Sequence, residues 1–337
     1  MEDNSQIKGC PVNNLVPPIF NIMGSKLCVI QFPHPSVESV PTRAKQKLNP
    51  IIKGWNKGSH KRKFMKAKGQ IVGSNNQLTN KQDLLFWGEW EPASWVKPIT
   101  QWQGNGVQPK WLHEPFLSKN SINSANTNCG SAGCNPMPYP NNYDNTDPFV
   151  FNDYFLYSLC RQVRKDKSGM SVPTQMQSLS QGSIILFGSA LSSPFPHFAL
   201  DTVFVVGESR LYHPCQYKKD LKGFIPKNYD MIMGFPNSQI QTQYTCYHGA
   251  TVNNPIEGMY SFVPCKPYPG YNLGFPRVML TNIHFAQFGN IIINSLSRNY
   301  HITNLHNNFQ ACKKIWDELC RIVNQQGYER GVNFEYK

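Results

Sequence analysis

The sequence predicts an α+β protein whose second half is rich in β-strands, arranged as a barrel or a sandwich. Three observations lead to this prediction. Apolar residues make up 40% of the 337 residues and charged residues only 16%, a balance that favours a folded core over disorder. Short apolar runs follow one another at close spacing between residues 181 and 293, which is typical of barrels and sandwiches. The last segment carries apolar residues at helical spacing.

The first half of the chain divides into three parts. Residues 1–25 contain Pro11, Pro17, Pro18 and Gly24 and predict an irregular arm. Residues 26–117 form a basic, tryptophan-rich region, with strands expected at 26–32 and 84–90. Residues 118–146 are rich in Asn, Gly and Pro. A stretch of this length without regular structure indicates a linker or a long functional loop.

Residues 147–337 are expected to form a β-rich domain with a C-terminal helix. The segments 181–189 and 200–206 are apolar and rich in β-branched residues, as in buried strands. The segment 149–161 is aromatic-rich and fits a strand or a helix equally. Further strands are expected at 244–251, 259–264, 277–280 and 289–293.

The C-terminal helix is predicted from a single apolar stripe. Its members recur at spacings of three and four residues: Phe309, Cys312, Trp316, Leu319, Cys320 and Val323. Gly327 is placed to end the helix. We therefore expect this helix to pack on a sheet.

The net charge is +13, from 33 basic and 20 acidic residues. Such a charge favours polyanionic partners, DNA or RNA in particular, although it is also compatible with a purely solubilising role. The longest apolar runs are strand-sized, so no membrane span is expected. The first residues do not resemble a signal peptide. We therefore expect a cytoplasmic protein with reduced cysteines. The sequence does not predict an oligomeric state.

A basic run between residues 53 and 68 is the clearest local signal, with seven Lys or Arg and no acidic residue. Cationic side chains in a loop can follow a phosphate backbone, and aromatic rings beside them can stack on bases. The candidate nucleic-acid-binding residues are Trp55, Lys57, His60, Lys61, Arg62 and Lys63. The alternative is a solvated loop whose charges contact nothing specific.

Glu89 and Glu91 are weak catalytic candidates. Two residues apart on a strand, both carboxylates would face the same side. Such a pair can act as acid and base or bind a divalent metal. The alternative, which we favour, is that Glu91, next to Pro92, lies at the solvent end of a strand.

No metal or cofactor site is predicted. Cys129 and Cys134 lie in a Gly-rich loop, but a zinc site needs a second pair of ligands at suitable spacing. Nucleophile elbows, P-loops, dinucleotide fingerprints and the HExxH motif are all missing from the sequence. Whether the protein is an enzyme is therefore left open.

The segment Tyr247-His248-Gly249-Ala250-Thr251 resembles the start of the nicotinamide-binding strand of ADP-ribosyltransferases. The resemblance implies that His248 and Gly249 take the positions of the His-Gly pair that cradles the cofactor, with Tyr260 as the stacking aromatic. The glutamate strand that follows late in that family is not evident here. A simpler interpretation is a strand end with His248 hydrogen-bonded near the surface.

Residues 179–206 combine a Gly-led apolar strand, a Pro-containing loop and the strand LDTVFVV. This pattern resembles the central hairpin of PUA-like barrels, the superfamily with the ASCH and EVE modules. The resemblance implies a pocket for a modified or flipped base. The leading hypothesis is thus a nucleic-acid-associated protein. The alternatives are a transferase or hydrolase with a site around His248, and a module that binds a protein partner through its tryptophan-rich region.

Overall fold

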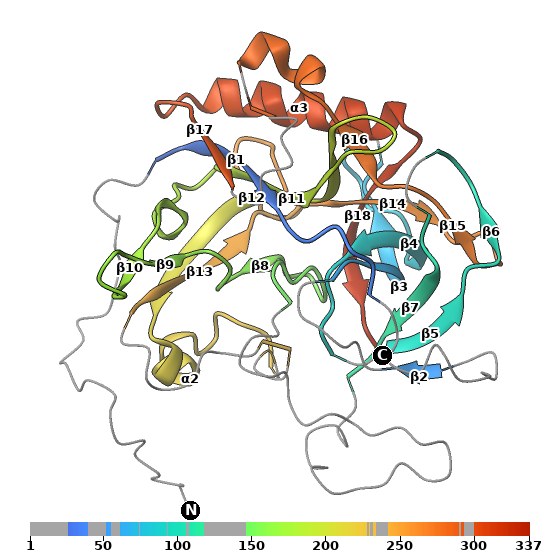
Figure 1. The fold of residues 1–337 in the computed structure, drawn as a ribbon, viewed down its shortest axis with the longest axis horizontal. Helices are drawn as coiled ribbons and strands as arrows, with labels where there is room; N and C mark the ends of the chain where they lie inside the picture. Colours follow the sequence, from blue (N-terminus) through green and yellow to red (C-terminus); the bar gives the residue numbers. More distant parts are fainter. Residues whose placement is uncertain are drawn as a thin grey trace, which may run out of the picture.

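The computed structural model contains two large sheets and one long helix (Figure 1). It describes residues 26–39, 52–54, 61–73, 75–92, 94–105, 108–117, 146–227, 229, 232–233, 242–289, 291–292 and 300–337. Strands outnumber helices throughout these ranges, which confirms the predicted β-rich α+β class.

The first sheet has seven strands. In spatial order six of them are β17 (His301–Asn304), β1 (Cys28–Pro33), β11 (Ile184–Leu191), β12 (His197–Tyr212), β13 (Tyr244–Gly249) and β8 (Leu156–Tyr157). The seventh, β16 (Val278–Leu280), pairs with β12. β1 runs parallel to β11 and the other pairs are antiparallel. β1 and most of β11 and β12 are buried, which explains their near-continuous apolar sequences.

The second sheet, here called the barrel sheet, also has seven strands. Their order is β18 (Glu329–Glu335), β14 (Val263–Pro267), β4 (Gln82–Gly88), β3 (Lys63–Ile71), β7 (Trp111–Pro115), β5 (Ser94–Pro98) and β2 (Ile52–Gly54). β18 also pairs with β3. The strands β3, β4, β14 and β18 therefore close into a small barrel, which removes their free edges.

Both sheets combine strands from the two halves of the chain. β1 from the first half pairs with β11, and β18 and β14 from the second half pair with β3 and β4. Residues 203 and 262 exchange two backbone hydrogen bonds of 2.9 Å and link the two sheets. The predicted linker at 118–146 lies outside the described residues except for Thr146. The regions on either side of it share both large sheets, so neither region forms a large sheet by itself.

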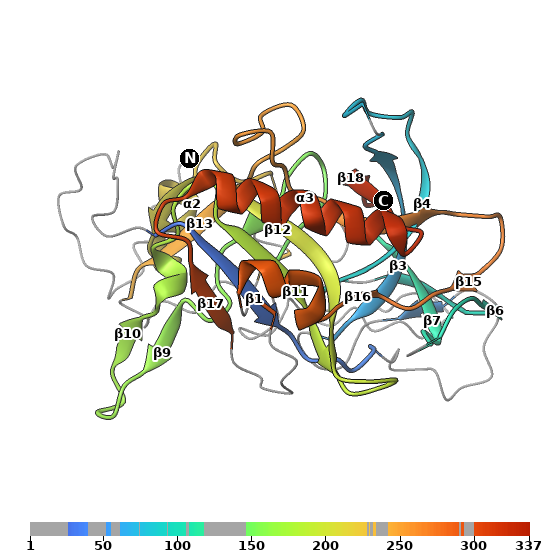
Figure 2. The same cartoon turned by 90° about the horizontal axis from the view of Figure 1, so that it is seen from above.

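The long helix α3 (Phe309–Gln325) confirms the predicted C-terminal helix. It lies along the top of the molecule in Figure 1 and across the strands of the first sheet in Figure 2. Asn308 caps its first turn, and Gly327, at a φ of 76°, follows its end as predicted. Trp316 is buried and its Nε1 donates to the carbonyl of Tyr260 at 2.9 Å. Phe309, at the start of the predicted stripe, is 38% exposed.

Short elements complete the fold. They are the hairpin of β9 (Val163–Lys165) and β10 (Ser171–Pro173), the pair β6 (Gln101–Trp102) and β15 (Leu273–Gly274), the short helix α2 (Tyr217–Asp220), and the 3₁₀ helices η1 (Gln175–Gln177), η2 (Pro214–Gln216) and η4 (Asn282–Phe288). The β9–β10 hairpin extends away from the body of the molecule (Figure 2).

Most predicted strands are present, with shifted ends. The predicted segments at 26–32, 84–90, 181–189, 200–206, 244–251 and 277–280 overlap β1, β4, β11, β12, β13 and β16. The segment 149–161 contains only the two-residue strand β8 and isolated bridges. The basic run, expected as a loop, contains the start of β3. The strand expected at 289–293 is not formed by the described residues 289, 291 and 292.

Cys215 is disulfide-bonded, so the expectation of reduced cysteines is wrong at this position. The six other cysteines of the described ranges are free thiols: Cys28, Cys160, Cys246, Cys265, Cys312 and Cys320. None of the helices in the described ranges is both long enough and apolar enough to span a bilayer.

Candidate functional site

The β3–β4 pairing brings the basic run and the two acidic candidates together. The strands pair antiparallel with Lys63 opposite Gly88. Arg62 and Lys63 lie at the start of β3, and Glu89 and Glu91 follow the end of β4. The acids that the basic run lacks in sequence are thus supplied by the neighbouring strand. Each glutamate pairs with a different cation. Glu91 is only 2% exposed, so the favoured interpretation, that it lies at the solvent end of a strand, is wrong.

Arg62 is the centre of a group that we call the ionic cluster, defined as His34, Arg62, Glu89, Asp201 and Arg277. All five side chains are at most 7% exposed. Arg62 Nη2 pairs with Glu89 Oε2, and Nη1 lies 3.3 Å from Asp201 Oδ2. Burial acts to lower the pKa of Arg62, but the two carboxylates outweigh it and raise the pKa. The arginine is therefore charged and held on two sides.

Arg277 connects the ionic cluster to two strands of the first sheet. Its Nη1 donates to Ser189 Oγ at 2.7 Å and lies 3.6 Å from Asp201 Oδ1. Its guanidinium also lies over the Trp87 ring, 5.0 Å from the ring centre. Asp201 thus stands between two arginines. Because Asp201 and Ser189 belong to β12 and β11, the cluster joins the first sheet to the barrel sheet.

A second buried ion pair lies beside this cluster. Lys63 Nζ is 3.7 Å from Glu91 Oε1, and both side chains are at most 2% exposed. His113 on β7 is fully buried, and neither of its ring nitrogens has a hydrogen-bond partner among the residues that the structure describes. Burial and the charge of Lys63 lower the pKa of His113 to about 3. This imidazole is therefore neutral near pH 7.

Burial removes Arg62 and Lys63 from the set of predicted phosphate contacts. Both side chains are 0% exposed and paired with carboxylates, so a nucleic acid cannot reach them in this structure. The expectation that they are exposed is wrong. Lys61 is partly exposed. The other predicted contacts, Trp55, Lys57 and His60, lie outside the described residues.

His248 and Tyr260 make separate contacts. The His248 ring stacks on Phe224 with the ring centres 4.0 Å apart, and its Nε2 is hydrogen-bonded to the Phe224 carbonyl group. Tyr260 Oη accepts a hydrogen bond from Arg330 at 2.5 Å, and its ring meets that of Trp316 edge to face. These contacts hold each side chain against the surrounding fold. They match the simpler interpretation of His248 as a hydrogen-bonded strand residue.

Exposed cations gather in two other segments. Residues 161–173, which include the β9–β10 hairpin, carry four cations and one acid, and so do residues 213–227 around α2. Both segments lie at the same end of the molecule in Figures 1 and 2. The exposed members are Arg164, Lys165, Lys167, Lys218, Lys219, Lys222 and Lys227. We call this surface the basic end.

The acids of the basic end are engaged in local hydrogen bonds. Asp166 Oδ1 accepts from the backbone of Ser168 and of Met170 at 2.8 and 2.9 Å, which fixes the turn of the β9–β10 hairpin. Asp220 Oδ2 accepts from the backbone of His213 at 2.9 Å. The cationic groups of the lysines and of Arg164 therefore face the solvent. The sequence feature that could have indicated this surface is Arg-Lys-Asp-Lys-Ser-Gly, a basic run that contains turn residues. It is shorter than the run at 53–68.

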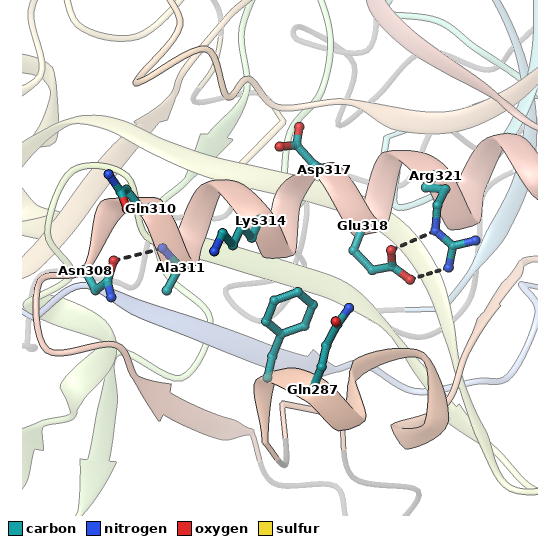
Figure 3. A pocket seen from close by; sticks show the side chains of 9 residues that line it. Gln287, Asn308, Gln310, Ala311, Lys314, Asp317, Glu318 and Arg321 are labelled. Carbon is teal, nitrogen blue, oxygen red and sulfur yellow. Dashed lines mark hydrogen bonds and ion pairs between the residues drawn. The ribbon is translucent and has the colours of Figure 1, made fainter.

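A shallow groove of about 700 Å³ lies between η4 and α3. Figure 3 shows the side chains that line it, among them Glu318 and Arg321, which are joined by hydrogen bonds. Lys314 and Arg321 on its wall are balanced by Asp317 and Glu318. A groove without excess charge has little attraction for a polyanion, so the basic end is the stronger candidate.

Within the described ranges, no three His, Cys, Asp or Glu side chains come together in a way that would hold a metal ion. No family model matches the sequence, and no curated protein or solved structure matches it with significance. The function must therefore be argued from the geometry alone.

Proposed function

We propose that this protein associates with nucleic acid through the basic end. The observation that carries the proposal is the distribution of exposed cations. Two of the predicted contacts, Arg62 and Lys63, are buried in ion pairs, while the hairpin and the α2 segment hold four cations each against one acid. A surface of this kind binds a phosphate backbone and releases counterions from it.

The geometry of the hairpin supports this proposal. Arg164, Lys165 and Lys167 lie close together on an element that extends from the body. Hydrogen bonds between residues 162 and 174 and between the Gln162 side chain and Thr245 hold its base. A hairpin fixed in this way presents its charges at a low cost in conformational entropy. Hairpins can also enter a nucleic-acid groove.

A more specific version of this proposal is that the protein recognises a modified or flipped base in a PUA-like pocket. Its support is the antiparallel pairing of β11 with β12, the two strands on which the resemblance rests. Aromatic residues lie close to these strands, among them Tyr157 and Phe187, whose ring centres are 5.5 Å apart. The enzyme alternative around His248 stays an untested prediction.

The direct test is the salt dependence of binding. The full-length protein is titrated with single-stranded DNA, single-stranded RNA and duplex DNA of equal length at several salt concentrations. We expect binding that weakens linearly on a logarithmic salt scale. The triple variant Arg164→Gln, Lys165→Gln and Lys167→Gln should reduce the slope for single strands by about two, since each lost phosphate contact contributes about 0.7.

A matched control replaces three exposed cations outside both the basic end and the basic run, Lys81, Lys110 and Lys314, with Gln. The control loses the same net charge and should keep most of the salt slope. If both triple variants lose the same slope, binding follows net charge and not the basic end. If the wild-type protein binds none of the three nucleic acids at low salt, the proposed function is wrong.

A further inference from the structure

Arg161, at the base of the β9–β10 hairpin, has an unusual environment for a cation. Its guanidinium lies over the Phe32 ring, with Cζ 5.0 Å from the ring centre. Its Nη1 is buried and has no hydrogen-bond partner within the described part of the chain. Among the described residues, no carboxylate forms an ion pair with it. A buried donor without a partner is rare in folded proteins because it costs free energy.

The backbone holds Arg161 in place on both sides. The carboxylate of the buried Asp147 accepts hydrogen bonds from the backbone N–H groups of Ser158, Leu159 and Cys160 at 2.7–2.9 Å. After Arg161, the side chain of Gln162 bonds twice to the backbone of Thr245, each at 2.7 Å. The segment is thus fixed before any ligand binds.

Arg161 itself adopts a φ of 60°, in the left-handed region that residues with a Cβ rarely occupy. Such conformations persist only where neighbouring contacts enforce them, and they concentrate at ligand sites. Thr174 Oγ1 donates to the Arg161 carbonyl at 2.7 Å and is one of those contacts. The Arg161 side chain lies over the ring of Phe32, whereas the other cations of the hairpin segment are exposed.

Aromatic rings complete the surroundings. The rings of Phe32 and Tyr300 are nearly parallel, 9° apart, with their centres separated by 6.4 Å. Tyr157 is buried and its hydroxyl donates to the Cys160 carbonyl at 2.6 Å. A guanidinium that packs on an aromatic ring stays charged, and its planar fork of N–H groups matches the oxygens of a phosphate. Burial lowers the pKa of Arg161, an effect that a bound anion would offset.

We infer that Arg161 binds one phosphate of a nucleic-acid strand whose neighbouring phosphates contact the hairpin, an inference that rests on the proposed function. From Arg161 to Lys165 the chain spans at most about 14 Å. A B-form strand carries one charge about every 3.4 Å along its axis. Several phosphates of one strand therefore fall within reach of Arg161, Arg164 and Lys165.

The test compares Arg161→Gln with Arg164→Gln, which removes the same charge from an exposed position three residues away. The probe is a fluorescent oligothymidylate of about 12 nucleotides, within the usual site size for single strands. We expect Arg161→Gln to lower the affinity about tenfold or more, because a charge-assisted, partly buried contact is lost. Arg164→Gln should lower it about threefold or less. Arg161→Lys keeps the charge without the fork and should fall between them.

The outcomes separate this inference from the proposed function. If Arg161→Gln loses no more affinity than Arg164→Gln, Arg161 is not a phosphate ligand, although the protein still binds nucleic acid. A second outcome is that the wild type binds no oligonucleotide, while inorganic phosphate raises the melting temperature of the wild type but not that of Arg161→Gln. In that case the proposed function is wrong, but Arg161 is still an anion-binding residue. If poly-glutamate binds as tightly as the oligonucleotide and needs Arg161, the ligand is a carboxylate and the inference is overturned. Should Arg161→Gln be unfolded, Arg161→Lys provides the same comparison.

Discussion

The ionic cluster and the hairpin use the same residue type in opposite ways. Arg62 is fully buried and held by Glu89 and Asp201. Arg161 is partly exposed and lies on an aromatic ring, with no carboxylate partner in the described ranges. A buried charge is tolerated only when it is paired. The charge of an arginine that pairs with two carboxylates is therefore compensated within the fold. An arginine without them is available to an external anion. The cation content of a segment therefore does not show which of its cations are already paired within the fold.

The largest expected effect comes from Arg62→Met. The change leaves Glu89 and Asp201 buried without their shared cation, and breaking a buried pair in this way costs about 3–5 kcal/mol. Urea unfolding at neutral pH measures the loss. The control is Lys61→Ala, at a partly exposed neighbouring position, which should change the free energy of unfolding by about 0.5 kcal/mol or less. Equal and small effects of the two changes would mean that Arg62 is solvated and that the ionic cluster is not formed.

A smaller effect is expected from His113 when the pH changes. Its pKa is lowered to about 3 in the folded protein, while an unfolded chain has a His pKa of about 6.5. The unfolded state therefore binds the proton more tightly between these values, and stability falls as the pH falls from about 6.5 towards 3. Between pH 7 and pH 5 this contribution is about 2 kcal/mol.

The change His113→Phe should remove that contribution. Urea unfolding at pH 7 and at pH 5 gives the change in the free energy of unfolding for the wild type and for His113→Phe. Between these two pH values the free energy of unfolding of the wild type should fall by about 2 kcal/mol more than that of the variant. The comparison within each protein cancels any packing change caused by the larger ring. The same loss in both proteins would show that His113 can take up a proton in the folded state, and hence that it is not sealed beside Lys63.

More of the fold than of the candidate site could be predicted from the sequence. The helix at 309–325 and the buried strands β11 and β12 follow from local periodicity and composition, and they were predicted. The pairing of β1 with β11 and of β18 with β3 depends on residues more than 150 positions apart, and nothing in a local pattern fixes such a register.

The site was predicted less well because it depends on which charges meet. Arg62 and Glu89 are 27 residues apart, and the β3–β4 register that joins them is a tertiary feature. The same applies to Arg161, whose missing partner and positive φ have no signature in a single sequence. The basic run at 53–68 was more prominent than the hairpin at 161–173 because cations can be counted in a sequence, whereas ion pairs cannot.

The smallest expected effect on stability comes from the hairpin. The triple change of Arg164, Lys165 and Lys167 to Gln should alter the free energy of unfolding by about 1 kcal/mol or less, because exposed charges contribute little to folding. The same urea titration measures it. A loss comparable with that of Arg62→Met would indicate that the hairpin charges are structural, and the contrast between the two regions would disappear.

The central claim is that the basic end, and not the basic run, meets the nucleic acid, and hydrogen–deuterium exchange with and without a bound single-stranded oligonucleotide tests it most directly. Amides that become covered or ordered by a ligand exchange more slowly. The account predicts slower exchange in residues 161–173 on binding, with little change in β3 (Lys63–Ile71), which is already paired on both sides. Slower exchange confined to residues 61–73, with the hairpin unchanged, would contradict it.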